Sequence, residues 1–451
     1  MHDTLIISVS GVRGIVGAGL TPELVSRFSS GFGMLALETG RREVVLARDA
    51  RASGPMFAAA VQAGLQSVGC GVIDCGLVPT PTAQLAVEHH GAGGGIVITA
   101  SHNPVEWNAL KFIGPDGVFL DAETGGRLRA LAEDGPLAHV AWDALGGLAS
   151  DPSAVQRHLD AVMALPIIDV ARIRERRFTV ALDGVRGVGG TIMPQLLEGL
   201  GCKVVGMDLE TDGAFPRPPE PLPEHLAGLG ALVRDSGADL GMAMDPDGDR
   251  LALVDEGGHA IGEDYTLAFA IRAVLSRTPG PVVVNLSTSL VVDDAARAYG
   301  VDVVRAPVGE ANVARAMRAQ QAVVGGEGNG GVMLPALHLG RDAPIAAGLV
   351  LQHLIDSGKT VSESVADAPA YSILKAKVPR GGDLDATYDA LAGTFSDATV
   401  DRTDGFRLAW DEGWLHVRPS GTEPIVRLIA EAPSPERARE LIEAAKTAHK
   451  S

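Results

Sequence analysis

Short apolar runs alternate with helical stripes along most of the chain. Valine, isoleucine and leucine dominate the runs 43–47, 96–98 and 282–285, which is typical of buried strands. Thr21-Pro22 predicts a helix start, because a capping hydroxyl precedes a proline at the first helical position. The apolar stripe of this helix consists of Leu24, Phe28, Phe32 and Leu35. Alternating strands and helices predict an α/β fold.

One junction occurs three times. At 67–74, 199–206 and 298–305 a helix end is followed by a glycine and then by a valine-rich strand. This repetition predicts three α/β domains of similar build.

The last part of the chain has a different pattern. Segments 408–410 and 414–417 alternate in polarity and predict antiparallel strands, and a closing helix is expected over about 435–449. Glycine, serine, aspartate and proline cluster at 146–152, which is typical of a domain boundary. We therefore expect domains at 1–150, 151–254, 255–366 and 367–451, the last a smaller α+β domain.

Composition and charge restrict the class of protein. The chain has 451 residues, 46% of them hydrophobic and 4% aromatic, so aliphatic side chains must fill several cores. A net charge of −18 argues against nucleic acid and anionic membranes as partners. No N-terminal signal and no run of about 18 apolar residues is present, which predicts a cytoplasmic protein. Cys70, Cys75 and Cys202 form no C-x-x-C pair, which predicts reduced thiols and no structural zinc.

A serine follows the 96–98 strand in the segment Thr99-Ala100-Ser101-His102-Asn103-Pro104. Pro104 lacks an N–H and disfavours the α conformation at Asn103, so this turn should be stiff. Open α/β sheets bind ligands at the carboxyl ends of their parallel strands. The alternative is an ordinary connection between a strand and a helix. Ser101 and His102 do not by themselves indicate a hydrolase triad, because neighbouring side chains at a strand end point apart.

Three carboxylates follow the expected strand 239–244. Asp245, Asp247 and Asp249 repel one another unless a cation joins them, and hard carboxylates on an open loop suit Mg²⁺. An EF-hand loop is a rival because Glu256 stands at its twelfth position, but Arg250 occupies the sixth, where that loop needs glycine. A solvated acidic turn is the other alternative.

A phosphate-binding segment is expected near the C-terminus. Arg418-Pro419-Ser420-Gly421-Thr422-Glu423-Pro424 lies between a strand ending at Val417 and one starting near Ile425. Hydroxyls, a glycine and exposed N–H groups flanked by Arg418 and Arg427 form a suitable cradle for phosphate. A hairpin with a surface arginine is the alternative.

Two other segments are rich in glycine. We expect residues 10–17 to form a loop that carries Arg13. We expect residues 325–331 to form a loop that presents Glu327 and Asn329, groups that suit sugar hydroxyls. The chain contains neither a Walker loop nor a G-x-S-x-G motif.

Together these motifs resemble those of the α-D-phosphohexomutase superfamily over nearly the whole chain. The motifs that carry the resemblance are Thr99 to Pro104, Asn108 to Lys111, Asp245 to Arg250, Gly326 to Gly331 and Arg418 to Arg427. Asn329 and Gly331 stand where many members have serine and histidine, and this version, with the opening Ser8 to Gly14, looks like the phosphoglucosamine mutase branch. The resemblance implies three related α/β domains with mixed sheets and a smaller C-terminal α+β domain around a central cleft.

The resemblance also implies a role for each candidate residue. Ser101 would be the phosphoserine, and Asp245, Asp247 and Asp249 would hold Mg²⁺ together with one of its oxygens. Arg13, Lys111 and His102 would act beside it; Lys111 is the usual candidate for proton transfer, and a histidine is the other. Arg250, Glu327 and Asn329 would meet the sugar. The phosphate of the substrate would meet Arg418, Ser420, Gly421, Thr422 and Arg427.

The implied reaction interconverts a hexose 6-phosphate and 1-phosphate through a 1,6-bisphosphate, on glucosamine phosphate. The partner would be a small sugar phosphate, and the chain a monomer or homodimer. Converging basic residues would overcome the negative net charge locally and would lower the pKa of Lys111. The alternatives are a phosphomannomutase/phosphoglucomutase of the same mechanism, a sugar-phosphate-binding protein without turnover, and a Mg²⁺-dependent sugar phosphatase.

Overall fold

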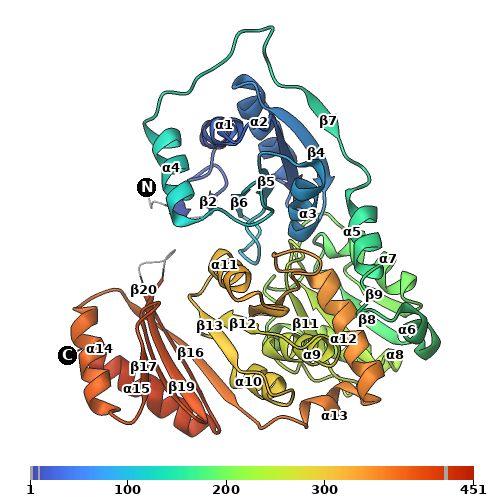
Figure 1. Cartoon of the computed structure of the whole chain (residues 1–451), viewed down its shortest axis with the longest axis vertical. Coiled ribbons are helices and arrows are strands. Elements are labelled where there is room, and N and C mark those ends of the chain that lie inside the picture. Colours follow the sequence, from blue (N-terminus) through green and yellow to red (C-terminus); the bar gives the residue numbers. More distant parts are fainter. Residues whose placement is uncertain (1–3, 9–10, 421–424, 451) are drawn as a thin grey trace.

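A computed structural model describes residues 4–8, 11–420 and 425–450. Four β-sheets follow one another along this part of the chain (Figure 1). The predicted fold class, three related α/β domains with mixed sheets and a C-terminal α+β domain, is confirmed. The limits at 150, 254 and 366 remain predictions. Among the described helices, none is long and apolar enough to cross a membrane.

The first three sheets share one order of strands. In each, the first and second strands are parallel neighbours joined by a helix. The third strand is parallel to the first and pairs on its other side. The fourth strand is antiparallel and pairs with the third. In the first sheet these strands are β3 (Glu43–Arg48), β4 (Gly71–Leu77), β5 (Gly95–Ile98) and β6 (Trp107–Ile113). In the second they are β8 (Thr179–Asp183), β9 (Lys203–Met207), β10 (Leu240–Met244) and β11 (Leu251–Val254). In the third they are β12 (Val282–Asn285), β13 (Val303–Ala306), β14 (Val324–Glu327) and β15 (Gly331–Met333).

The repeated glycine junction predicted from the sequence is confirmed. The connecting helices are α2 (Gly54–Ser67) and α3 (Thr80–His90), α7 (Gly189–Gly199) and α8 (Ala227–Ser236), and α10 (Leu290–Arg297) and α11 (Glu310–Gln320). Gly69, Gly201 and Gly300 follow the first helix of each pair with φ of 85°, 78° and 71°, a backbone conformation that favours glycine.

Two expected glycine-rich loops are wrong in part, because sheet pairing overrides the weak strand preference of glycine. Residues 11–15 form β2 (Gly11–Ile15), which with β1 (Ile6–Ser8) extends the first sheet beyond β6. A Cβ on Gly11 would lie 2.5 Å from the Leu110 carbonyl oxygen, so this close pairing requires glycine. Residues 325–331 contain most of β14, a turn and the first residue of β15.

The remaining helices surround these sheets. They are α1 (Pro22–Glu38), α4 (Ala122–Glu133), α5 (Ala154–Met163), α6 (Val170–Arg176), α9 (Asp264–Leu275), α12 (Ala343–Ser357) and α13 (Val361–Val365). As predicted, Thr21 caps α1 by accepting the Leu24 N–H. One hydrophobic core runs through the second and third domains, because α12 packs against α9 and also against α5, α6 and α7. The strand β7 (Leu148–Ser150) pairs beside β4.

The C-terminal sheet is antiparallel throughout. Its order is β16 (Ser372–Pro379), β20 (Ile425–Ala432), β19 (Gly413–Pro419), β18 (Phe406–Trp410) and β17 (Thr399–Asp401). The helices α14 (Leu384–Thr394) and α15 (Pro435–Lys450) pack on one face and form a separate core. Residues of this sheet also face the other domains: His416 contacts Ser287, and Arg427 lines a cavity together with Arg13.

Candidate active site

Ser101 lies in the turn that joins β5 to β6. Its φ of 49° falls in the left-handed region, which a residue with a side chain rarely adopts. Such a conformation costs on the order of 1 kcal/mol and persists only where surrounding contacts hold it. The Ser101 N–H donates to Thr99 Oγ1 at 2.9 Å, and Thr99 Oγ1 donates to Asp49 Oδ2 at 2.7 Å.

Arg51, which no sequence motif indicated, holds the backbone of this turn in place and is called the clamp below. Its side chain is fully buried and pairs with Asp49 at 3.0 Å. The guanidinium also donates to four backbone carbonyl oxygens at 2.6–2.8 Å, those of Ser101, Asn103, Pro104 and Trp107. The only sequence signal nearby was the Arg48-Asp49 pair at the end of a strand. The clamp fixes the backbone that presents the Ser101 hydroxyl.

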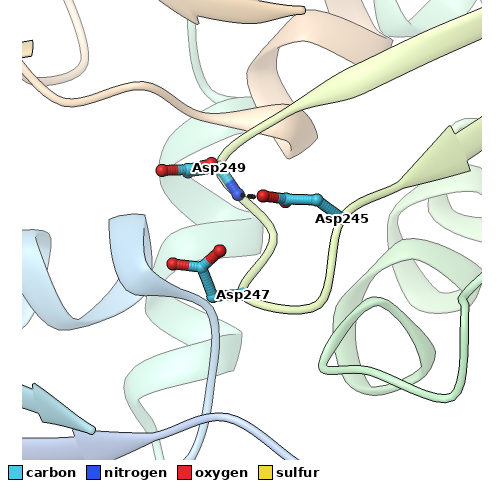
Figure 2. A group of neighbouring side chains, drawn as sticks. All are labelled: Asp245, Asp247 and Asp249. Atoms are coloured by element: carbon cyan, nitrogen blue, oxygen red, sulfur yellow. Dashed lines mark hydrogen bonds between the residues drawn. The ribbon is translucent and has the colours of Figure 1, made fainter. Parts of the chain in front are cut away.

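The three aspartates occupy the turn between β10 and β11. Asp245, Asp247 and Asp249 are all buried, and one carboxylate oxygen from each lies within 4.8 Å of the others (Figure 2). Asp245 Oδ1 accepts the N–H groups of residues 248, 249 and 250 at 3.1–3.3 Å, which shapes the turn. Their burial excludes the solvated acidic turn.

Ser101 and the aspartate turn meet across the interface between the first two domains. Ser101 Oγ donates to Asp245 Oδ2 at 3.2 Å, although the two residues lie 144 positions apart. Thr80, at the start of α3, supports the same junction: its hydroxyl donates to Asp247 Oδ2 at 2.8 Å. Thr80 was not among the residues predicted from the sequence.

The aspartate cluster fits a hard divalent cation. Among the described residues, no hydrogen-bond donor reaches Asp247 Oδ1 or Asp249 Oδ1, although both atoms are buried. Burial raises the pKa of Asp245 well above its usual value, and the charges of Asp249 and Asp247 add to this effect. A cation among the three would satisfy the two oxygens and offset the repulsion.

The expectation that neighbouring cations lower the pKa of Lys111 is wrong. Lys111 Nζ lies 2.6 Å from Asp247 Oδ2 and 3.8 Å from Asp249 Oδ2. Burial disfavours the charged ammonium, but the two carboxylates outweigh it and raise the pKa of Lys111. Lys111 is therefore a cation and a proton donor in this structure.

His102 has the opposite character. Its Nδ1 lies 3.4 Å from Ser101 Oγ, and its Nε2 lies 3.8 Å from a carboxylate oxygen of Glu220. Burial lowers the pKa of His102 well below its usual value, and Arg250 and Arg13 lower it further. A neutral imidazole beside the serine can accept a proton.

Two predicted arginines stand beside the serine turn. The Arg250 guanidinium lies 3.7 Å from Asp249, 3.9 Å from Asp245 and 3.3 Å from Glu220. Arg13 projects from β2 and donates to Asn103 Oδ1 at 3.0 Å. Both add positive charge close to Ser101.

Arg341 joins the metal turn to the sugar turn and was missed in the sequence. It is 7% exposed and contacts three carboxylates: Asp249 at 2.6 Å, Glu327 at 3.0 Å and Glu310 at 3.0 Å. It belongs to no motif; the segment before α12 packs against the aspartate turn, the end of β14 and the start of α11, and this brings Arg341 to the site.

The predicted sugar residues are placed differently from one another. Glu327 is buried and accepts hydrogen bonds from Asn285 Nδ2 at 2.8 Å and Gly309 N at 3.0 Å. Asn329 Oδ1 accepts the Gly331 N–H at 3.2 Å and so shapes the turn between β14 and β15. Of the two, Glu327 lines the cavity described next, and Asn329 does not.

Two cavities flank the serine turn. The first, of about 430 Å³, is lined by residues of the first and third domains and by Arg250, among them Arg13, Ser101, His102, Lys111, Glu327 and Arg341. The second, of about 480 Å³, shares Arg13 and His102 with the first and reaches the C-terminal sheet at Lys375, Lys377, Arg427 and Ile429. A ligand with two charged ends can therefore contact the same serine turn from either side.

Of the expected phosphate-binding residues, the structure describes Arg418, Ser420 and Arg427. Arg427 lines the second cavity. Arg418 pairs with Asp404 at 3.1 Å, and the backbone N–H of Ser420 donates to the Ile425 carbonyl oxygen at 2.9 Å. Gly421 and Thr422 lie outside the described residues.

Comparison with known proteins gives consistent matches. Residues 5–136, 156–258 and 262–371 match phosphoglucomutase/phosphomannomutase alpha/beta/alpha domains I, II and III, and residues 374–448 match the C-terminal domain of the same proteins. A phosphoglucomutase/phosphomannomutase from Thermococcus kodakarensis is 40% identical over 439 residues, which cover 96% of each chain. A probable phosphoglucosamine mutase from Methanopyrus kandleri is 38% identical over 96% of this chain and 95% of its own. The crystal structure of a phosphoglucomutase/phosphomannomutase family protein from Burkholderia thailandensis superposes with a TM-score of 0.86 at 25% identity, over 99% of this chain and 97% of its own.

Proposed function

The chain belongs to the phosphoglucomutase/phosphomannomutase family, and we propose from this that it interconverts the 1-phosphate and 6-phosphate of a hexose, with glucosamine phosphate as its preferred substrate. The observation that carries the proposal is the 3.2 Å contact of Ser101 Oγ with Asp245, beside a cavity lined by Arg13, Lys111 and Arg250. Phosphoryl transfer depends mainly on such positioning and charge neutralisation.

The reaction has two balanced halves. In the first, the bond from phosphorus to Oγ of phosphorylated Ser101 breaks, and a bond from phosphorus to a hydroxyl oxygen of the sugar monophosphate forms. The hydroxyl proton passes through His102 to the departing serine oxygen. The resulting 1,6-bisphosphate turns round, its other phosphoryl group returns to Ser101, and the serine proton passes back through His102 to the departing sugar oxygen.

Charged residues of the chain hold the reactants during both halves. Asp245, Asp247 and Asp249 would hold Mg²⁺, which would withdraw charge from the transferring group. Lys111 and Arg250 add fixed positive charge at the same place, since both contact these carboxylates. Glu327, oriented by Asn285 and Arg341, offers acceptor oxygens to sugar hydroxyls.

Replacing the nucleophile tests this proposal. We expect Ser101→Ala to lower kcat for conversion of the 1-phosphate to the 6-phosphate at least about 10³-fold, because alanine has no oxygen to carry the phosphoryl group. Mass spectrometry after treatment with glucose 1,6-bisphosphate should find one phosphoryl group on wild-type Ser101 and none on the variant. The control is Ser357→Ala, at the C-terminal end of α12, which should retain both properties. Unchanged turnover by Ser101→Ala would contradict the proposal.

The same assay separates the alternatives. The relative from Methanopyrus kandleri and the turn containing Asn329 favour glucosamine 1-phosphate, so its kcat/KM should exceed those of mannose and glucose 1-phosphates. A higher value for either of the other sugars would overturn this preference and leave the mutase reaction in place. Release of inorganic phosphate without isomer formation would indicate a phosphatase, and binding without either product would indicate a binding protein.

A further inference from the structure

A long loop of the second domain, residues 208–222 after β9, lies against the serine turn of the first domain. The centroid of the Phe215 ring lies 5.0 Å from Cζ of Arg51, the clamp of that turn. Arg217 ties the loop to its own domain, since its guanidinium pairs with Asp183 at 2.7 Å. Contacts with both domains therefore hold the loop beside the serine turn.

Glu220 of this loop places its carboxylate between two groups of the site. Its Oε1 lies 3.3 Å from the Arg250 guanidinium and 3.8 Å from Nε2 of His102. Its backbone carbonyl oxygen lies 2.7 Å from Nδ1 of His225, a contact that fixes the loop at this residue. Glu220 also lines the cavity of about 480 Å³, together with His102. The carboxylate is therefore held at one nitrogen of the imidazole.

Glu220, His102 and Ser101 form a chain of contacts that joins a carboxylate, an imidazole and a hydroxyl. At the other ring nitrogen, His102 Nδ1 lies 3.4 Å from Ser101 Oγ. An ionised carboxylate only accepts hydrogen bonds, so Nε2 is the nitrogen that carries the proton of a neutral ring beside it. Nδ1 then faces the serine oxygen with its lone pair. Hydrogen bonds used in catalysis are often long before the substrate binds, and both contacts have room to shorten.

We propose that Glu220 is a positioning residue, which accepts a hydrogen bond from Nε2–H of His102 and thereby turns Nδ1 toward Ser101 Oγ. The inference rests on the proposed function, in which His102 passes a proton between sugar and serine. Nδ1 takes the proton of the attacking hydroxyl and gives that proton to the departing serine oxygen, while Nε2 keeps its own proton and Glu220 stays ionised. A carboxylate in this place fixes both the rotation of the ring and the nitrogen that carries its proton.

A double-mutant cycle tests whether Glu220 acts through His102. We expect Glu220→Met to lower kcat for the preferred sugar 1-phosphate about tenfold and to leave KM within about threefold, because the substrate still binds but the ring is no longer oriented. In the His102→Ala background the same change should lower kcat less than about twofold, since the ring that Glu220 orients is absent. The control is Glu224→Met, an exposed change four residues further along the chain, which should match the wild type.

Nitrogen NMR of isotope-labelled protein shows which ring nitrogen carries the proton. The signals of the His102 ring are those that are missing from the spectrum of His102→Ala. At about pH 8, where an ordinary histidine is neutral, we expect the wild type to carry this proton on Nε2. Glu220→Met should show a mixture of the two tautomers, because no carboxylate then selects between them.

Three results would overturn the inference. An equal fall of kcat in the wild-type and His102→Ala backgrounds would show that Glu220 acts through Arg250 or through the fold. The same tautomer in Glu220→Met and in the wild type would show that the carboxylate does not select it. An equal loss of kcat in the Glu224→Met control would remove the specific role of Glu220. If the wild type does not interconvert sugar phosphates, the mutase proposal fails, and the NMR comparison still decides whether Glu220 orients His102.

Discussion

Arg341 shows how one residue can connect two parts of a site. Its guanidinium reaches Asp249 in a turn, Glu327 at the end of β14 and Glu310 at the start of α11. Five donors in a rigid fork allow this, and a lysine could not replace it with the same geometry. Arg341 thus holds Asp249 Oδ2 and leaves Oδ1 of the same carboxylate available for a cation.

Arg341→Met should therefore weaken the metal site more than it changes the chemistry. We expect the Mg²⁺ concentration for half-maximal turnover to rise about tenfold, a typical cost of losing the partner that orients a metal ligand. Magnesium titration of turnover measures this. Arg318→Met, which removes an exposed arginine of α11 that pairs with Asp116, is the matched control. An unchanged magnesium requirement would show that Arg341 does not orient Asp249.

At the scale of elements, one position in the repeated domain recurs in the site. The turn between the third parallel strand and the antiparallel strand carries Ser101 in the first domain, the aspartates in the second and Asn329 in the third. Glu327 is the last residue of β14 and directly precedes the turn that contains Asn329. The shared strand order therefore brings three chemically different turns to corresponding ends of three sheets.

The serine turn depends on its clamp. Arg51→Met would leave Asp49 buried without its ion-pair partner and four backbone carbonyl oxygens without their donor. We expect the free energy of unfolding to fall by about 3–5 kcal/mol, as when one partner of a buried pair is removed. Chemical denaturation measures this. Arg48→Met, on the same strand end, should cost about 1 kcal/mol or less. Equal losses in both variants would argue against a special role for the clamp.

At the scale of the whole molecule, buried polar contacts dock the C-terminal sheet on the third domain. Glu431 accepts the Leu290 N–H at 2.8 Å and also contacts Ser289 and Trp414. His416 Nδ1 lies 2.8 Å from Ser287 Oγ. Asp264, behind this interface, accepts the Ser289 N–H at 2.9 Å. Burial raises the pKa of Asp264 to about 7, and the nearby charge of Glu431 contributes to the rise.

This carboxyl makes the stability of the folded chain depend on pH. The pKa of Asp264 is higher in the folded than in the unfolded state. Its contribution to the free energy of unfolding is therefore fully present below about pH 4 and is lost as pH rises through about 7. Asp264→Asn should remove this dependence and raise the free energy of unfolding at pH 8 by about 1–3 kcal/mol, since one pKa unit corresponds to about 1.4 kcal/mol. Chemical denaturation at pH 5 and pH 8 measures the free energy of unfolding of the variant and the wild type. Asp235→Asn, at an exposed site on α8, is the control. If the free energy of unfolding changes equally with pH in Asp264→Asn and in the wild type, Asp264 is not the source of the pH dependence.

Much of the fold follows from residue order, because periodicity and turn chemistry are local. Features that depend only on residues close in sequence are found as expected. They are the strand at 96–98, the helix cap at Thr21 and the left-handed glycines at 69, 201 and 300. The aspartates also lie together for a local reason, since they alternate within five residues of one turn.

Only the tertiary structure could decide which turns meet and what charge each group carries. Residues 11–15 form a strand because they pair with β6. The pKa of Lys111 is raised, and not lowered as expected, because Asp247 lies beside its ammonium group. Arg51 and Arg341 have no motif, and their partners lie up to 56 and 92 positions away. Burial and electrostatic energy are sums over spatial neighbours, and separation along the chain does not determine which residues those neighbours are.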